Sequence, residues 1–312
     1  MIAALFDRLR QGDRNALARL VSQAARGEHL GEMQAALLPS PSGRGAGGEG
    51  NCARVVAFTG SGGVGKSTLI GKLIPLVREQ NLKVAVLACD PQSPLTGGAL
   101  LGDRFRMGNS TDDGVFIRSL AAVSGHGGLA EHLDVIIRLL ETFGFDVIFL
   151  ETVGSGQGDV DVRKYSDVVA LLVQPESGDD VQWEKAGILE CADVVIVHKS
   201  DLPGADQTAA QVRAALDLSM AHAAPVLRVS TKANTGHAEL WQTIQVLPAR
   251  RQQPTAARLL FQAALDSLGQ RFDAVERTRD AELEHLADAW RRGESSTPDA
   301  INSLLRILTQ RI

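Results

Sequence analysis

The feature that most constrains this chain is a glycine-rich run from Gly60 to Thr68, with the sequence Gly-Ser-Gly-Gly-Val-Gly-Lys-Ser-Thr. It follows an apolar run at 54–59 that predicts a buried strand and precedes a stretch at 69–77 that predicts a helix. Strand, Gly-x-x-x-x-Gly-Lys-Ser and helix form the context of a phosphate-binding P-loop, in which the lysine reaches the β- and γ-phosphates and the serine ligates Mg²⁺. The residues expected to bind the nucleotide here are Gly62, Gly63, Val64, Gly65, Lys66, Ser67 and Thr68.

Short apolar runs alternate with helical segments from residue 54 to about residue 246. Near-continuous β-branched runs of this kind predict an α/β fold with a mostly parallel sheet and helices on both faces. The predicted strands are Val55–Phe58, Val84–Ala88, Val115–Ile117, Val147–Leu150, Val168–Val173, Val194–Val197 and Val226–Val229. Ligands of such sheets bind at the carboxyl ends of the strands, so the residues that follow these runs are the candidates for chemistry.

Acidic residues stand at the ends of two of these predicted strands. Asp90 closes the second strand, and Glu151 closes the Walker-B-like run at 147–150. Asp103 joins them if the intervening glycine-rich loop folds back, although a cap or loop role is its alternative. The Gly154 N–H is expected to bond the γ-phosphate and to sense its loss. We expect Mg²⁺ at Ser67, Asp90, Asp103 and Glu151, and catalysis by Lys66, Asp90, Asp103 and Glu151.

The sequence His198-Lys199-Ser200-Asp201 directly follows another predicted strand and is similar to the Asn-Lys-x-Asp signature of GTPases. In that signature the aspartate accepts hydrogen bonds from guanine N1 and N2, whereas adenine offers it no matching donor. Such a buried mismatch is worth about 10⁴-fold in discrimination. His198 replaces the usual asparagine and is expected to donate to a ring nitrogen of the base. The weaker signal Ser230-Thr231-Lys232, after the last strand, fits a loop that contacts guanine O6.

Composition restricts the classes of function. The formal net charge of −5 argues against a general nucleic-acid binder. Cys52, Cys89 and Cys191 lack the spacing of metal sites or disulfide frameworks, as expected in a reducing compartment. No apolar run reaches the roughly 18 residues of a membrane span, and Asp7 and Arg8 interrupt the N-terminus too early for a signal peptide. We expect a cytoplasmic protein with no membrane or nucleic-acid partner.

Four segments organise the chain by composition and periodicity. Residues 1–38 have helical spacing and predict an N-terminal helical extension, and residues 39–53, rich in Gly, Pro and Ser, predict a flexible linker. Residues 54–250 carry the alternating strands and helices of the nucleotide-binding domain. Residues 251–312 predict further helices, which suit packing or self-association.

At this level the chain resembles the MeaB/ArgK family of accessory GTPases for adenosylcobalamin-dependent acyl-CoA mutases, within the SIMIBI class of P-loop proteins. The most specific shared pattern is Thr-Gly-Gly-x-x-Leu-Gly-Asp, which ends at Asp103 and is not a general GTPase feature. The other matching blocks are 12–19, the P-loop, 90–91, 116–119, 151–157, 178–182 and 185–190.

The resemblance implies a GTP-hydrolysing chaperone that gates cobalamin delivery to a mutase and protects or reactivates it. It implies a homodimer formed through the helical extension, contact with the mutase's cobalamin-binding subunit, and an adenosyltransferase as a further partner. The family's third mobile loop, which couples partner binding to hydrolysis, matches Asp179, Gln182 and Lys185. Read without the family, Asp179 and Lys185 are ordinary surface charges.

The chain also departs from the family pattern. His198 is one departure, and Trp183 and Glu184 stand where glycine and isoleucine are usual. These changes favour a client related to methylmalonyl-CoA mutase, such as an isobutyryl- or hydroxyisobutyryl-CoA mutase. The alternatives are a nickel-insertion GTPase of the same class, which usually has His or Cys clusters near the P-loop, a P-loop protein kinase of a transport system, and a binding module without hydrolysis.

Overall fold

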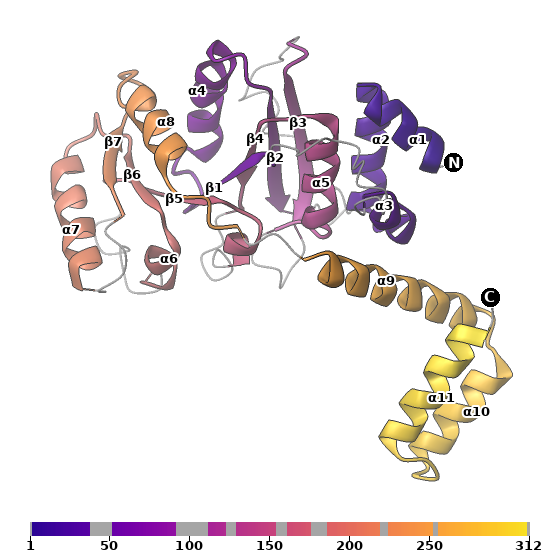
Figure 1. Cartoon of the computed structure of the whole chain (residues 1–312). Coiled ribbons are helices and arrows are strands. Elements are labelled where there is room, and N and C mark those ends of the chain that lie inside the picture. The colour runs from indigo at the N-terminus through magenta and orange to yellow at the C-terminus, as the bar shows by residue number, and fades with distance from the viewer. Residues whose placement is uncertain are drawn as a thin grey trace. The chain divides into compact units, whose positions relative to one another are not determined.

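The computed structural model describes residues 2–37, 52–91, 112–122, 129–153, 161–175, 186–218, 224–251 and 255–310 (Figure 1). The chain forms two compact units. Unit 1 comprises Met1–Glu28 and Ser40–Gln253, and unit 2 comprises His29–Pro39 and Pro254–Ile312. Among the helices in these ranges, none combines the length and the apolar character that a membrane crossing requires.

Unit 1 is built on a seven-stranded parallel sheet with the order β3-β2-β4-β1-β5-β6-β7. Each strand begins at or next to its predicted start, so the α/β fold class is confirmed. The strands are β1 Arg54–Gly60, β2 Val84–Pro91, β3 Val115–Ala122, β4 Val147–Glu151, β5 Val168–Val173, β6 Val194–His198 and β7 Val226–Val229. All carboxyl ends of a parallel sheet lie at one edge, where the candidate residues are therefore expected to meet.

Alternate residues of the central strands enter two different cores. Val194 and Ile196 of β6 pack with α4 (Lys66–Glu79) and α8 (His237–Val246). Val195 and Val197 pack on the opposite face with α7 (Ala205–Leu218). A period of two along the strand directs successive side chains to opposite faces, and burial on both faces explains the continuous apolar runs in the sequence. Short helices α6 (Ala186–Cys191) and η1 (Asp161–Lys164) complete the connections in this half of the sheet.

The helical stretch at the N-terminus consists of three helices: α1 (Ile2–Arg10), α2 (Arg14–Ala25) and α3 (Leu30–Leu37). Asp13 separates the first two, because its carboxylate caps α2 by accepting from the backbone N–H groups of Asn15 and Ala16. In unit 1, α2 packs against α5 (Leu133–Phe143).

Unit 2 joins α3 to the C-terminal helices α9 (Ala256–Arg277), α10 (Ala281–Arg291) and α11 (Thr297–Gln310). Within this unit α3 packs against α9, and α10 packs against α11. Most of the predicted linker at 39–53 lies outside the described residues, and the four-segment division of the chain stays a prediction.

We expect Leu73→Ala to lower the free energy of unfolding of unit 1 by about 2–5 kcal/mol, because Leu73 of α4 is fully buried and truncation leaves a cavity. Leu218→Ala is the matched control, since Leu218 of α7 is 81% exposed and its truncation is expected to cost no more than about 0.5 kcal/mol. Urea denaturation followed by circular dichroism measures both. Equal losses for the two variants would contradict this assignment of the core.

Candidate nucleotide site

The loop between β1 and α4 is shaped by Gly65, which precedes the first residue of α4. Its φ of +102° is left-handed, and as a glycine it contributes no side-chain cap to this helix start. The left-handed conformation suits glycine, which has no Cβ to strain. The Lys66 ammonium turns back across the loop and donates to the carbonyl oxygens of Gly60, at 2.8 Å, and Ser61, at 3.2 Å. A helix N-terminus and a lysine therefore converge on one place, which is the electrostatic requirement for binding a polyphosphate.

Two carboxylates lie beside this loop. Glu151 ends β4 opposite Phe58 of β1 and Ala88 of β2, and Asp90 lies two residues further along β2. Both side chains are buried, with exposed fractions of 5% for Glu151 and 6% for Asp90. The Ser67 hydroxyl donates to Glu151 Oε1 at 2.6 Å, which links the first turn of α4 to the end of β4.

These oxygen donors suit Mg²⁺, which prefers carboxylates, hydroxyls and water to softer ligands. Within the ranges that the structure describes, no three His, Cys, Asp or Glu side chains cluster around a possible ion. A magnesium ion here would therefore depend on Ser67, Asp90, Glu151, water and the phosphates themselves. Burial raises the pKa of the Cys89 thiol to about 12, and sulfur is in any case a poor ligand for Mg²⁺.

The base-side residues follow β6 and β7. His198, the last residue of β6, is 3% exposed. Its Nδ1 lies 2.7 Å from the carbonyl oxygen of Val64, and its Nε2 lies 2.8 Å from the Thr231 hydroxyl. Both ring nitrogens are thus engaged with protein groups. The side chain thus spans the gap between two loops, and its donation to a ring nitrogen of the base stays a prediction.

Lys199 and Asp201 are also fixed by neighbouring groups. The Lys199 ammonium donates to the Gly63 carbonyl at 3.1 Å and to Gln174 Oε1 at 2.7 Å, so its stem extends towards the P-loop. Asp201 accepts from the Ser230 hydroxyl, and this hydrogen bond holds the pKa of the Asp201 carboxyl below its ordinary value. Asp201 is exposed and charged at neutral pH, as an acceptor for two N–H groups of a guanine must be.

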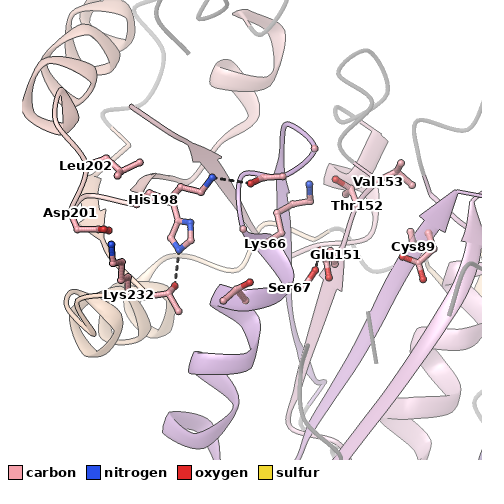
Figure 2. A pocket seen from close by; sticks show the side chains of 17 residues that line it. Lys66, Ser67, Cys89, Glu151, Thr152, Val153, His198, Asp201, Leu202 and Lys232 are labelled. Atoms are coloured by element: carbon pink, nitrogen blue, oxygen red, sulfur yellow. Dashed lines mark hydrogen bonds between the residues drawn. The ribbon is translucent and has the colours of Figure 1, made fainter. Parts of the chain in front are cut away.

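One cavity of about 630 Å³ connects the two ends of this site (Figure 2). Lys66 lies in the middle of the view, with His198, Asp201 and Lys232 on one side and Ser67, Glu151 and Cys89 on the other. The lining residues are Gly62, Gly63, Gly65, Lys66, Ser67, Thr68, Cys89, Asp90, Glu151, Thr152, Val153, His198, Lys199, Asp201, Leu202, Thr231 and Lys232.

Most of the predicted site residues line this cavity, although Val64 and Ser230 act from behind it through their bonds to His198 and Asp201. The sequence analysis did not identify four of the lining residues: Cys89, Thr152, Val153 and Leu202. Each lies within two positions of a predicted acid: Cys89 precedes Asp90, Thr152 and Val153 follow Glu151, and Leu202 follows Asp201. Extending each motif by two residues would therefore have included them. The predicted residues outside the described part of the chain are Asp103, Gly154, Asp179, Gln182 and Lys185.

We expect Lys66→Ala to weaken binding of a magnesium nucleoside triphosphate by at least about 100-fold, because it removes the buried cation at the phosphate end. Lys72→Ala, which removes an exposed lysine from the same helix, is the matched control and is expected to bind as the unaltered chain does. Fluorescence titration with a labelled nucleotide measures both. Similar affinity for the two variants would show that the phosphates bind elsewhere.

Comparisons with known proteins identify the family of this chain. The family model described as "Methylmalonyl Co-A mutase-associated GTPase MeaB" matches residues 43–260. A Pyrococcus abyssi protein with GTPase in its name is 44% identical over 253 residues, which cover 78% of this chain and 75% of the relative. The fused isobutyryl-CoA mutase of Nocardia farcinica is 38% identical over 196 residues, which cover 62% of this chain and 18% of that protein.

Among solved structures, the "LAO/AO transport system kinase" has a similar fold, with a TM-score of 0.59 at 22% sequence identity over 98% of this chain and 97% of that one. That likeness supports the fold alone. The family match covers more than half of the chain, and the relative from Pyrococcus abyssi is covered to three quarters of its length. The chain therefore belongs to the MeaB family of P-loop GTPases.

Proposed function

We propose that this GTPase is a chaperone that gates adenosylcobalamin loading of an acyl-CoA mutase and protects or reactivates that mutase. The observation that supports the nucleotide part is one cavity that is lined both by Asp201 and by Lys66, Ser67 and Glu151. A guanosine triphosphate in this cavity would have its base at Asp201 and its phosphates on the P-loop. The mutase part is supported by the description of the matching family and by a relative in which a similar segment is fused to an isobutyryl-CoA mutase.

Hydrolysis at this site depends on positioning and charge neutralisation. Lys66 and the N–H groups at the start of α4 would neutralise the phosphates, and Glu151, which accepts from the Ser67 hydroxyl, would orient water beside them. A bound Mg²⁺ would neutralise further phosphate charge, held by Ser67, Asp90 and Glu151, with Asp103 as an additional proposed ligand. Among the lining residues in the described ranges there is no arginine. We therefore propose a slow basal rate, of the order of 10⁻⁴ to 10⁻² s⁻¹, that rises when a partner completes the site.

The partner is proposed to act through two segments that lie outside the described residues. Asp179, Gln182 and Lys185 are proposed to couple mutase binding to hydrolysis, and Gly154 is proposed to sense the γ-phosphate. The helices of the C-terminal segment are proposed to form a homodimer, and the mutase's cobalamin-binding subunit is the proposed contact, with an adenosyltransferase as a second partner. We propose that the protein works in the cytoplasm and that its client is methylmalonyl-CoA mutase or an isobutyryl- or hydroxyisobutyryl-CoA mutase.

A saturating cobalamin-dependent acyl-CoA mutase is expected to raise the rate of phosphate release from GTP at least about tenfold, because the partner supplies groups that the isolated site lacks. The measurement is free phosphate over time, with methylmalonyl-CoA, isobutyryl-CoA and hydroxyisobutyryl-CoA mutases tested in turn. The Lys66→Ala chain with each mutase controls for contaminating hydrolysis. An unchanged rate with all three would contradict the chaperone proposal, and transfer of the γ-phosphate to the mutase would replace it with a kinase activity.

A further inference from the structure

His198 connects two loops that are distant in sequence. It ends β6, while Val64 belongs to the P-loop and Thr231 follows β7. The two hydrogen bonds of its ring, 2.7 Å to Val64 and 2.8 Å to Thr231, therefore tie the phosphate side of the cavity to the base side. Figure 2 shows the ring between Lys66 on one side and Asp201 and Lys232 on the other.

The partners of the ring determine its protonation. A backbone carbonyl only accepts, so Nδ1 carries the hydrogen that is donated to Val64. In the neutral ring Nε2 then has no hydrogen and accepts from the Thr231 hydroxyl. Neither nitrogen has an N–H left for a nucleotide base. While the ring holds these two bonds, base recognition is left to Asp201 and its neighbours.

The ring also sets the position of the P-loop by direct contact. A Cβ added to Gly65 would lie 2.5 Å from His198 Cε1 and 2.7 Å from Nδ1. The imidazole is thus seated against the backbone that immediately precedes Lys66. Because the side chain is 3% exposed and held at both nitrogens and on one face, it has little freedom to move independently of either loop.

We propose that neutral His198 is a positioning residue that couples the two ends of the site, so that a nucleotide spanning both ends meets loops already fixed relative to each other. A ligand that contacts both loops binds more tightly as a result, because binding no longer has to order the loops relative to each other. A ligand that contacts only the phosphate end gains little affinity from the coupling. The inference rests on guanine-nucleotide binding at this site and is independent of the mutase partner.

The charges around the ring favour its neutral form. Burial lowers the pKa of His198, and Lys199 lowers it further, against the opposing effects of the hydrogen bond to Val64 and of Asp201. Stability that depends on the neutral ring is fully present above the ordinary histidine pKa of 6.5 and declines as the pH falls through the lowered value. The titratable and charged groups facing the ring or its immediate surroundings are Lys66, Lys72, Lys199, Asp201, Lys232 and His237.

Calorimetric titration of the full chain with GDP and, separately, with magnesium pyrophosphate tests the coupling. We expect His198→Ala to weaken GDP binding by about 10- to 100-fold, since two hydrogen bonds and the contact with the P-loop are lost. Pyrophosphate, which reaches only the P-loop, is expected to lose less than about threefold. His198→Asn keeps a donor at the position of Nδ1 and is expected to recover more GDP affinity than His198→Gln, whose amide lies at the position of Nε2.

Thr231 provides a second route that leaves the histidine in place. Thr231→Val keeps the shape but removes the hydroxyl, and it is expected to weaken GDP binding by about 3- to 10-fold, whereas Thr231→Ser restores the bond. In the His198→Ala background the same change is expected to add almost nothing, because the bond it breaks is already absent. Thr243→Val is the matched control, since that hydroxyl bonds to the carbonyl of Glu239 within α8.

If His198→Ala loses the same factor of affinity for GDP as for pyrophosphate, the proposal is overturned, because the ring would then only support the P-loop. Additive effects of the His198 and Thr231 changes would overturn it as well. If His198→Ala does not fold by circular dichroism, the Thr231 series decides. Absence of GDP binding by the unaltered chain would overturn both this inference and the guanine-nucleotide site on which it rests, whereas failure of mutase stimulation leaves it intact.

Discussion

The site depends on the approach of a polyphosphate to the N-terminus of α4. Gly65 begins this helix with a left-handed φ of +102°, and a side chain there would collide with the His198 ring. Lys66, the next residue, bridges back to the Gly60 and Ser61 carbonyls and places a buried cation at the same point. Gly60 itself has no room for a side chain, because an added Cβ would lie 2.3 Å from the Leu172 carbonyl oxygen of the neighbouring strand.

The parallel sheet then brings the other groups to this loop. β1 lies between β4 and β5, so the P-loop has the end of β4 and its glutamate on one side and the strands leading to His198 on the other. Residues that are far apart in sequence meet because their strands all end at one edge. The order of the strands also separates the phosphate end of the cavity from the base end. The acids of β2 and β4 gather at the phosphate end, and the residues after β6 and β7 gather at the base end.

The sequence predicts strands that are defined by burial better than it predicts strand ends that depend on tertiary hydrogen bonds. The strand at Val168–Val173 was predicted with the bounds that the structure has, because both of its faces are buried and its apolar run is continuous. β3 extends five residues past its predicted end at Ile117, because it is an edge strand with partly exposed side chains such as Arg118, whose guanidinium bonds to Ser22 of α2. Propensity does not record such tertiary bonds.

The bridge made by His198 lay beyond sequence reasoning for the same reason. Its partners are residues 64 and 231, and neither position is recognisable from the identity of residue 198. Local motifs predicted that these loops share a nucleotide, which needs only their positions at strand ends. They did not predict that a side chain would join the loops directly, which needs the distance between them.

Calorimetry of the purified chain with GTP and with ATP, each with and without magnesium, tests directly whether this cavity is a guanine-nucleotide site. We expect magnesium-dependent binding of GTP at one site per chain and a preference over ATP of about 10³-fold or more, because adenine presents Asp201 with no pair of donors. Equal or tighter binding of ATP, or no magnesium-dependent binding of GTP by the folded chain, would contradict it.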